Sequence, residues 1–402
     1  MSQAQNLATG AMGSASAREC AAPARAFAEF EIRDDPQAAS AAWDEIHADG
    51  LATAYQSKAF VGLWLRTVGR AEAVEPMIVL VRDERGGISA LLPLAVRWRL
   101  GLRVAEFVGG KHANFHMGVF RAGLAVDRDE VLGLLRRIGA SARLDAFFFV
   151  NQPELWQGSS NPLRALGGQK SPSFGHATQL QKNFDQWFEA HYSKAARRKL
   201  RKKTRRLAER GAVASFVAQD EASAREALAA LFAHKAARAK ATGQVNDFDD
   251  PAAVRFLEIA ACERAAEHGA LIELRAMRCG ERIVAVFGGL AHAGRFYGVV
   301  TSHDPDAEIA RSSPGELLIL DVIRDLHERG FKTFDLGVGE ARYKDAVCET
   351  SEALFDSALG LTFKGRAASL CFLLARRVKR WIKQRPWAWS LVAPMRRRLR
   401  PS

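Results

Sequence analysis

The segment from Ser312 to Lys344 constrains the fold more than any other part of the chain. It begins with Ser-Ser-Pro-Gly-Glu-Leu, which is typical of a helix N-terminus, because proline in the first turn loses no hydrogen bond and already has a suitable φ. Apolar residues then recur with helical period until Gly330, which is typical of a helix end. An apolar strand is predicted from Phe331 to Leu336. The segment therefore predicts a helix followed by a buried strand, as in an α/β fold.

Beyond this strand, Gly337 and Gly339 are expected to release the backbone into a loop that carries Tyr343 and Lys344. Ionisable side chains just past the end of a central strand are well placed for chemistry. A tyrosine hydroxyl can protonate a leaving group, and a lysine ammonium can stabilise an oxyanion. A solvated loop pair is the alternative. Asp335, inside the strand, either orients this loop or is paired in the core.

The start of the predicted helix is a candidate anion-binding site, because the first N–H groups of a helix have no intrahelical partner. We expect the N–H groups of three residues to face a phosphate or pyrophosphate, with an arginine adding charge. Simple helix capping is the alternative. The candidate cofactor-binding residues are Arg311, Ser312, Ser313, Gly315, Glu316 and Leu317. Together with the Tyr-Lys loop, they predict transfer of a group from a phosphate-bearing carrier.

Ser-Pro-Gly before the helix, followed by Phe-Asp-Leu-Gly-Val-Gly-Glu-Ala-Arg-Tyr-Lys, resembles the CelD-like (cellulose-biosynthesis) acetyltransferase family of the GNAT superfamily. That family is related to the Fem-type aminoacyl transferases. The resemblance extends over residues 50–350 or so, and implies an α/β fold of tandem GNAT-like units with mixed central sheets flanked by helices. It also places His234 in a helix, as the leading candidate for deprotonating an acceptor amine. A structural histidine is the alternative.

The same resemblance implies acetyl-CoA or another acyl-CoA as co-substrate. The acceptor it implies is an amine or hydroxyl on a small molecule or saccharide, in a cell-envelope or exopolysaccharide precursor. The Ser-Ser-Pro-Gly start differs from the usual glycine-rich loop of GNAT proteins, so aminoacyl-tRNA, the donor of Fem-type relatives, stays open. A non-catalytic accessory protein of polysaccharide synthesis is a third alternative.

Composition and turn signals divide the chain into segments. A disordered tail over 1–26, two α/β domains over 27–175 and 176–362, and a basic amphipathic tail over 363–402 are expected. The family resemblance implies that the first domain is GNAT-like and that the second is the GNAT-like acyltransferase domain. Strands are predicted at 77–81, 88–96, 104–108, 147–150, 271–277, 283–290 and 295–300, and helices at 39–47, 60–68, 221–240 and 252–268. The repeated strand–turn–strand pattern suggests duplication of one unit.

Positive charge is concentrated in two segments of the chain. The formal net charge is +13, and without the twelve basic residues that follow Asp356 it would be +1. Residues 194–206 hold nine more basic residues and no acidic one. Such density predicts a phosphate-bearing carrier, an RNA backbone or a sugar nucleotide, although a solvated helix face is the alternative. The candidate substrate- or anion-binding residues are Arg197, Arg198, Arg201, Lys202, Asp335, Gly337 and Gly339.

The C-terminal segment 367–402 combines an apolar stripe with basic residues and tryptophans. Leu370, Leu374 and Val378 recur at helical spacing, and Trp387 and Trp389 follow. This pattern predicts an amphipathic helix on an anionic membrane surface. A helix packed on the second domain, with a disordered basic end, is the alternative.

The five cysteines are scattered and contain no Cys-x-x-Cys pair. This argues against a disulfide framework or a zinc site and fits a reducing compartment. His112 and His116 are too sparse for a metal site and are interpreted as loop residues, with a substrate contact as the functional alternative. We therefore expect no metal, and a cytoplasmic protein that is at most peripheral on the inner face of the membrane.

Overall fold

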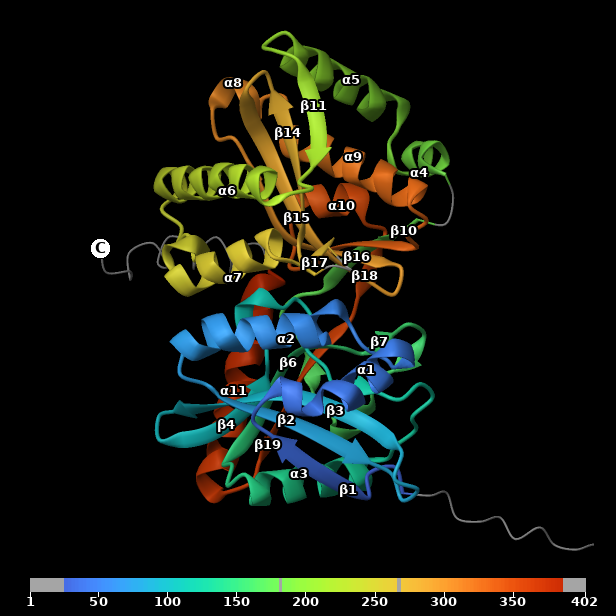
Figure 1. The fold of residues 1–402 in the computed structure, drawn as a ribbon, viewed down its shortest axis with the longest axis vertical. Helices are drawn as coiled ribbons and strands as arrows, with labels where there is room; N and C mark the ends of the chain where they lie inside the picture. The colour runs from blue at the N-terminus through green and yellow to red at the C-terminus, as the bar shows by residue number, and fades with distance from the viewer. Residues whose placement is uncertain (1–24, 181–182, 266–268, 386–402) are drawn as a thin grey trace, which may run out of the picture.

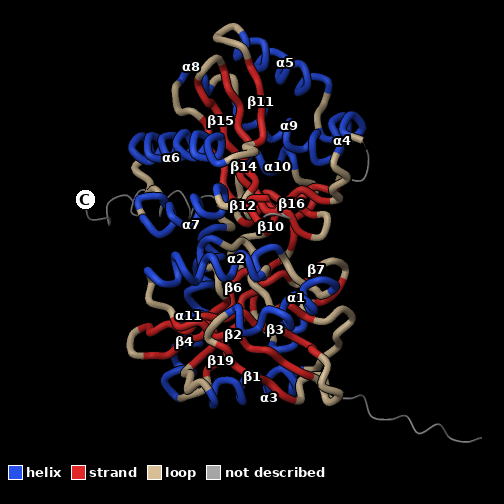
Figure 2. Tube along the Cα trace, viewed as in Figure 1, coloured by secondary structure: helices blue, strands red, loops and turns tan. Residues whose placement is uncertain are grey.

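The computed structural model describes residues 25–180, 183–265 and 269–385, which form two α/β units stacked along the long axis of the molecule (Figure 1). Each unit has a mixed sheet with helices packed against it (Figure 2). The predicted fold class is confirmed. In these ranges no helix combines the length and apolar character that a membrane span needs. Most of the expected N-terminal tail lies outside the described residues.

The sheet of the first unit has the strand order β1-β2-β3-β4-β6-β19-β9, and β5 pairs with β3. The strands are β1 (Glu29–Arg33), β2 (Glu75–Arg82), β3 (Ile88–Arg99), β4 (Leu102–Phe107), β5 (Val119–Phe120), β6 (Ala146–Pro153), β9 (Gln169–Lys170) and β19 (Leu354–Gly360). Within the described residues, β4 and β6 are the only neighbouring strands of this sheet that run parallel. The four strands predicted for this half of the chain are found in β2, β3, β4 and β6.

The helices of the first unit include one from the far end of the chain. They are α1 (Ser40–Asp49), α2 (Lys58–Trp64), α3 (Arg128–Ser141) and α11 (Phe363–Lys383), with the short turns η1 (Pro36–Ala39), η2 (Ala54–Gln56), η3 (Leu65–Gly69), η4 (Gly110–His112) and η5 (Pro162–Leu166). A small hairpin joins β7 (Leu155–Trp156) to β8 (Ser159–Ser160). The predicted helix at 60–68 is found as α2 continued by η3.

The sheet of the second unit has the order β11-β14-β15-β16-β17-β10-β18. Its strands are β10 (Gly175–Gln179), β11 (Val213–Val217), β14 (Glu273–Cys279), β15 (Arg282–His292), β16 (Arg295–His303), β17 (Thr333–Val338) and β18 (Thr350–Glu352). Two-residue turns join β14 to β15 and β15 to β16. Gly280 and Gly294 have φ of +61° and +72° in these turns, which confirms both predicted hairpins.

Helices cover both faces of this second sheet. They are α4 (Phe184–His191), α5 (Lys194–Ala208), α6 (Glu221–Thr242), α7 (Pro251–Cys262), α8 (Ala307–Ala310), α9 (Pro314–Glu328) and α10 (Arg342–Val347), with η6 (Asp247–Asp249) and the small hairpin β12 (Arg264–Ala265) and β13 (Gly269–Ala270). Val286 of β15 joins the core under α6 and α7, whereas Ala285 and Phe287 join the core under α9. This alternation follows from the two-residue period of a strand. The helix predicted over 252–268 ends at Cys262, and residues 266–268 lie outside the described part.

The two units repeat one plan. In each, three antiparallel strands (β2-β3-β4 or β14-β15-β16) are followed by a helix (α3 or α9) and by a strand parallel to the third (β6 or β17). The apolar core is continuous between the units, since Phe60 of α2 contacts Phe256 of α7 with ring centroids 5.5 Å apart.

The chain returns to the first unit after completing the second. Strand β19 pairs with β6, and α11 packs on β19 and β6. The expected boundary at 362 is therefore wrong as a division between units, because residues 354–383 belong to the first sheet and its helix layer. The alternative considered for the C-terminal helix, packing on the second domain, is contradicted for the same reason, because α11 packs mainly on β19 and β6.

Candidate active site

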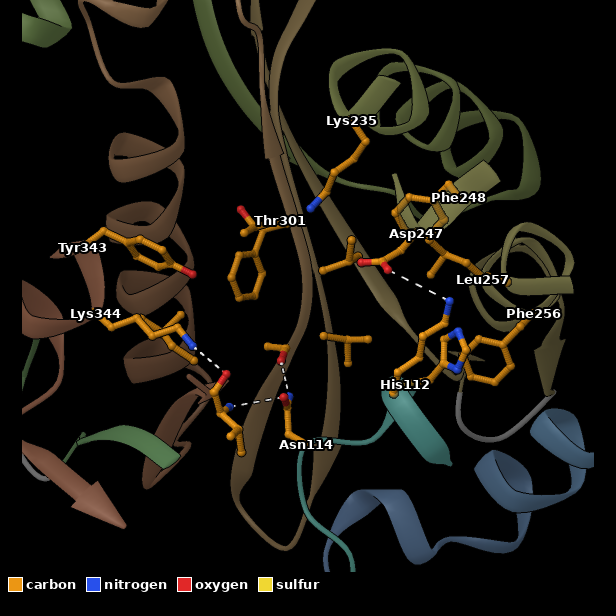
Figure 3. A pocket seen from close by; sticks show the side chains of 18 residues that line it. His112, Asn114, Lys235, Asp247, Phe248, Phe256, Leu257, Thr301, Tyr343 and Lys344 are labelled. Atoms are coloured by element: carbon orange, nitrogen blue, oxygen red, sulfur yellow. Dashed lines mark hydrogen bonds and ion pairs between the residues drawn. The ribbon is translucent and has the colours of Figure 1, made fainter. Parts of the chain in front are cut away.

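A cavity opens in the second unit where two parallel strands separate. The ladder between β16 and β17 covers only residues 295–297 and 333–335. Beyond it, β16 from Gly298 to Thr301 lines one side of a cavity of about 290 Å³, and β17 lines the other (Figure 3). A strand that is no longer hydrogen-bonded to its neighbour has backbone donors and acceptors available for an extended ligand. The gap is therefore suited to the arm of a carrier molecule.

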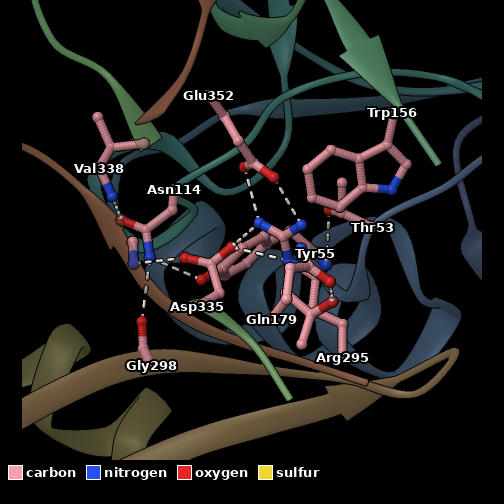
Figure 4. A network of polar contacts seen from close by, with 12 residues as sticks. Thr53, Tyr55, Asn114, Trp156, Gln179, Arg295, Gly298, Asp335, Val338 and Glu352 are labelled. Carbon is pink, nitrogen blue, oxygen red and sulfur yellow. Dashed lines mark hydrogen bonds and ion pairs between the residues drawn. The ribbon is translucent and has the colours of Figure 1, made fainter. Parts of the chain in front are cut away.

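Asn114, from the first unit, bridges the two strands at the point where they separate. Its Nδ2 donates to the carbonyl oxygen of Gly298 at 3.1 Å, and its Oδ1 accepts from the amide of Val338 at 3.2 Å. Nδ2 also lies 2.7 Å from the hydroxyl oxygen of Tyr55 (Figure 4). The side chain thus takes the place of ladder bonds between β16 and β17. A residue of the first unit completes a site in the second, which the sequence analysis did not predict.

We predict that Asn114→Ala lowers the free energy of unfolding by about 1–3 kcal/mol, because it leaves part-buried backbone groups of β16 and β17 without this partner. It should also raise KM, since the gap between the strands is no longer fixed. Chemical denaturation and steady-state kinetics measure the two effects. Asn183→Ala is the control, because it removes only the exposed cap of α4. Wild-type stability and KM in Asn114→Ala would contradict the bridging role.

The backbone geometry explains why residues 337 and 339, the two glycines of the predicted loop, are glycine. Gly337 has a φ of +76°, and a Cβ there would lie 2.5 Å from Nδ2 of Asn114. Gly339 has a φ of +105°, and its amide donates to the carbonyl of Phe174 at 3.0 Å. They position the chain beside the cavity through backbone geometry. The predicted loop beyond them is wrong in one respect, because Tyr343 lies in the short helix α10.

Tyr343 and Lys344 reach the cavity from α10 (Figure 3). Lys344 is buried, and its Nζ donates to the carbonyl oxygens of Gly337 and Val338 at 3.2 and 3.3 Å. Burial lowers the pKa of Lys344, and the charge of Asp335 opposes this effect. Burial raises the pKa of Tyr343, so the phenol is protonated at neutral pH. The structure therefore brings the predicted proton donor and the predicted cation to one cavity.

The opposite wall of the cavity carries polar side chains from both units. Lys235 of α6 and Asp247 of η6 line it, together with Lys111 and His112 of the first unit. Burial is the main cause of a lowered pKa for Lys235. The Nε1 of Trp64 donates to Nδ1 of His112 at 3.2 Å, so the neutral ring carries its proton on Nε2. His112 and Lys235 thus line the cavity from different units, and the sequence analysis had not singled out Lys235.

His234 does not line the cavity. Its side chain is buried, with Nδ1 3.1 Å from Oγ of Ser302 and Nε2 4.0 Å from Oδ2 of Asp304. Burial lowers its pKa, and the carboxylate of Asp304 opposes this. These contacts fit the structural histidine that was the alternative in the sequence analysis. The neighbouring Lys235 reaches the cavity instead, because adjacent helical residues point about 100° apart.

The predicted anion site at the start of α9 is partly satisfied by the protein itself. The carbonyl of Ser313, a residue with a φ of +49°, accepts from the amides of Glu316 and Leu317 at 3.0 and 3.2 Å. The expectation that these two amides face a phosphate is therefore not met. A methyl group on Gly315 would lie 3.7 Å from Cβ of His303, at the end of β16. The helix start thus adjoins the far end of the strand that lines the cavity.

The other residues of the helix start differ in exposure. Ser312 is fully buried, and its hydroxyl has no hydrogen-bond partner in the described ranges. Arg311 is exposed and pairs with Glu308 at 2.5 Å. The carboxylate of Glu316 pairs with Lys203 of α5 at 2.5 Å. The start of α9 therefore carries both positive and negative side chains, and each of these two carboxylates pairs with a cation.

The basic helix α5 packs beside the start of α9, as the Lys203 pair shows. Of the four predicted anion contacts, Arg198, Arg201 and Lys202 are exposed and Arg197 is half-buried. Arg197 pairs with Glu189 at 2.5 Å. The structure therefore brings the basic helix α5 to the predicted anion site at the start of α9. Tyr343 and Lys344 lie elsewhere, on α10 at the cavity.

Asp335 is an internal ion-pair partner. Its side chain is fully buried, and Oδ2 accepts from Nε of Arg295 at 3.0 Å (Figure 4). Arg295 also pairs with Glu352 at 2.7 Å, and its guanidinium lies 4.3 Å from the ring centre of Trp156 in the first unit. The core role considered in the sequence analysis fits these contacts. The carboxylate does not line the cavity, so the predicted ligand contact at Asp335 is not met.

Among its described residues, the first unit does not repeat this site. Its parallel strands β4 and β6 pair at 104–105 and 146–147, and beyond that point Phe107 and Phe149 fill the space with ring centroids 4.8 Å apart. Helix α3 begins with Asp127 and Glu130, which cap each other's backbone amides. Two carboxylates at a helix start disfavour an anion. The first unit therefore supports the site through Asn114, Lys111 and His112.

Comparison with known proteins shows a family resemblance in the second unit. Residues 194–345 match the model of the family described as "Acetyltransferase (GNAT) domain". The predicted resemblance to the GNAT superfamily is confirmed over this part of the chain, which is less than half of its length. The match runs from the start of α5 into α10 and so contains β16, β17 and Tyr343. A comparison with curated proteins finds no match.

Solved structures resemble both units together. The crystal structure of FemX is 10% identical, with a TM-score of 0.55, and the alignment covers 85% of this chain and 99% of that one. A conserved protein of unknown function from Bacteroides thetaiotaomicron is 13% identical, with a TM-score of 0.51, covering 81% and 100% of the two chains. At these identities the likeness establishes the shared two-unit fold.

Proposed function

We propose that this protein transfers an acyl group from an acyl-CoA to an amine or hydroxyl acceptor. The observation that carries this proposal is the cavity between the separating strands β16 and β17, with Tyr343 and Lys344 at one wall. The GNAT domain match over the same residues supports it. A saccharide or cell-envelope precursor as acceptor, and a cytoplasmic location, belong to the proposal through the family resemblance.

The chemistry follows from the polar groups that line the cavity. The acceptor nitrogen attacks the thioester carbon, so that a C–N bond forms and the C–S bond breaks. The ammonium of Lys344 stabilises the negative oxygen of the intermediate. Tyr343 donates its proton to the leaving sulfur, and Lys235, in its neutral form, accepts the proton released by the acceptor. The products are an amide and the free thiol of CoA.

Strand β16 leads from the cavity toward cationic groups. From Gly298 to His303, β16 extends about 17 Å at roughly 3.4 Å per residue. Its far end adjoins Gly315 at the start of α9, where Lys203 and Arg206 of α5 lie. A pantetheine arm along β16 would therefore place its phosphates beside α5 and the start of α9.

Aminoacyl transfer from aminoacyl-tRNA is the second candidate. The basic helix α5 favours it, because Arg201 and Lys202 are exposed on a helix without acidic residues. The fold shared with FemX is compatible with it. A non-catalytic accessory role in polysaccharide synthesis is the third, and the buried ionisable groups of the cavity argue against it.

Thermal-shift measurements with coenzyme A, acetyl-CoA, tRNA and nucleotide sugars separate these candidates. A ligand at 100 times its Kd stabilises the folded protein by about 2.7 kcal/mol. Stabilisation by coenzyme A and acetyl-CoA, followed by thiol release with an amine acceptor, is the expected result. Stabilisation by tRNA alone would favour aminoacyl transfer. Binding of nucleotide sugars without turnover of any thioester would favour the accessory role.

We predict that replacing Arg197, Arg198, Arg201 and Lys202 by glutamine weakens binding of the anionic ligand and flattens its salt dependence. If the ligand is tRNA, the magnitude of the slope of log K against log salt should fall by about 3. Each removed cation leaves one phosphate without a protein contact, so binding releases fewer counterions from the RNA. Filter binding at several salt concentrations measures this. Arg225→Gln, which removes an exposed cation of α6, is the control. Unchanged affinity and slope in the quadruple variant would show that this face of α5 is only solvated.

A further inference from the structure

Helix α11 has two chemically different faces. On the inward face, Phe372 stacks on Phe148 of β6 with ring centroids 4.4 Å apart. Arg376 pairs with the buried carboxylate of Asp356 at 2.5 Å, and Arg380 donates to a backbone carbonyl at 2.5 Å. These two arginines are therefore turned into the protein.

The outward face of α11 carries an exposed apolar stripe. Phe363, Leu370, Leu374, Val378 and Trp381 are 88%, 61%, 50%, 57% and 45% exposed. Their spacing of three, four and seven residues places them on one side of the helix. They make up half of the large hydrophobic side chains that are exposed in the described part of the chain, so this exposure is concentrated on one helix. A concentrated apolar patch marks an interaction surface.

Exposed cations flank this stripe. Lys364, Arg366, Arg377 and Arg385 are exposed, and no acidic residue follows Asp356 in the sequence. The sequence continues with Trp-Ala-Trp and Arg-Arg-Arg-Leu-Arg. Apolar side chains between cations, with tryptophan nearby, match the interface of an anionic lipid bilayer, where hydrocarbon lies beneath negative headgroups.

We propose that the outward face of α11 docks on the surface of an anionic lipid bilayer, with the helix lying in the plane of the membrane. This docking is independent of the proposed acyl transfer. A second copy of the chain is disfavoured as the occupant, because it would bring the like charges of two α11 helices together without an acidic residue on either. The helix lies along the surface because its inward face already packs on β19 and β6.

Vesicle sedimentation at physiological salt tests this proposal. The full-length protein should sediment with phosphatidylglycerol-containing vesicles and stay in solution with phosphatidylcholine vesicles. The double variant Leu374→Glu, Val378→Glu should bind the anionic vesicles at least tenfold more weakly, because it places carboxylates in the apolar stripe. Arg377→Gln should weaken binding about fivefold and reduce its dependence on salt. Thermal unfolding and coenzyme A binding should stay at wild-type values in all variants.

Two further variants of the chain make this test more specific. Leu155→Glu is the matched control, because Leu155 is 65% exposed on β7, away from α11, and the variant should bind vesicles as the wild type does. A chain ending at Arg385 retains α11 and should retain measurable binding to anionic vesicles. Wild-type indifference to anionic vesicles, unchanged binding by the double variant, or complete loss in the shortened chain would overturn the proposal. A concentration-dependent dimer that the double variant abolishes would assign the stripe to a second copy instead.

Discussion

Replacement of Tyr343 by phenylalanine is expected to slow acyl transfer by about 10²–10⁴-fold, the usual contribution of a general acid or base. Tyr343 points into the cavity from α10, and burial raises the pKa of its hydroxyl. The proton is therefore available when the C–S bond of the thioester breaks. The substitution removes one oxygen atom and keeps the ring, so carrier binding should persist. Single-turnover rates with acetyl-CoA and calorimetric titration of coenzyme A measure the two quantities separately.

Tyr192→Phe is the matched control for this experiment. Tyr192 is buried outside the cavity, and its hydroxyl has no hydrogen-bond partner in the part of the chain that the structure describes. Its loss should leave both rate and binding unchanged. An unchanged single-turnover rate in Tyr343→Phe would remove this tyrosine from the mechanism. A raised Kd for coenzyme A with an unchanged rate would assign it to carrier binding.

The elements around the cavity could be predicted because local patterns determine them. The Ser-Pro-Gly start and Gly330 bound α9, and β17 follows at the expected position within two residues. The turns at Gly280 and Gly294 identified the meander of β14, β15 and β16. Each of these signals is contained within a few residues of sequence.

The remaining parts of the site depend on contacts between distant residues. Asn114 lies more than 180 residues from Gly298 and more than 220 from Val338, the backbone groups that it bridges. Its sequence neighbourhood contains only the turn η4 and carries no signal for that role. The return of β19 to the first sheet has the same origin, because its pairing partner β6 lies about 200 residues earlier. A short apolar strand does not reveal in its own sequence which sheet it will join.

His234 shows where a pattern pointed to the correct helix and the wrong residue. The family resemblance placed a titratable residue in α6, and α6 does line the cavity, through Lys235. Which of two neighbours faces the cavity depends on how α6 is rotated against the sheet. That rotation is set by buried residues such as Leu228 and Leu231. The weak amphipathic pattern of this alanine-rich helix left the rotation undetermined.

The largest effect on stability is expected for Arg295→Met, which should lower the free energy of unfolding by about 3–5 kcal/mol. Arg295 is mostly buried and pairs with Asp335 and Glu352, so its removal leaves two carboxylates in the core without a cation. It also removes the stacking on Trp156 that joins the units. Urea denaturation at pH 7 measures the loss. Arg225→Met, which breaks only the exposed i,i+4 pair with Glu221, should cost less than about 1 kcal/mol.

The stability lost in Arg295→Met should also depend on pH. The direction of this dependence follows from the pKa of the carboxylates that Arg295 pairs with. Burial raises the pKa of Glu352, and Arg295 opposes that rise, so removing the arginine raises the pKa further. In the variant the folded state then binds more protons than the unfolded state, and its stability falls as pH rises through the carboxylate range. The difference from wild type should therefore shrink when urea denaturation is repeated at pH 5. The second substitution Asp335→Asn should restore part of the loss at pH 7, because it removes one unpaired charge. A single variant that is as stable as wild type at both pH values would show that the buried pair contributes nothing to the junction of the two units.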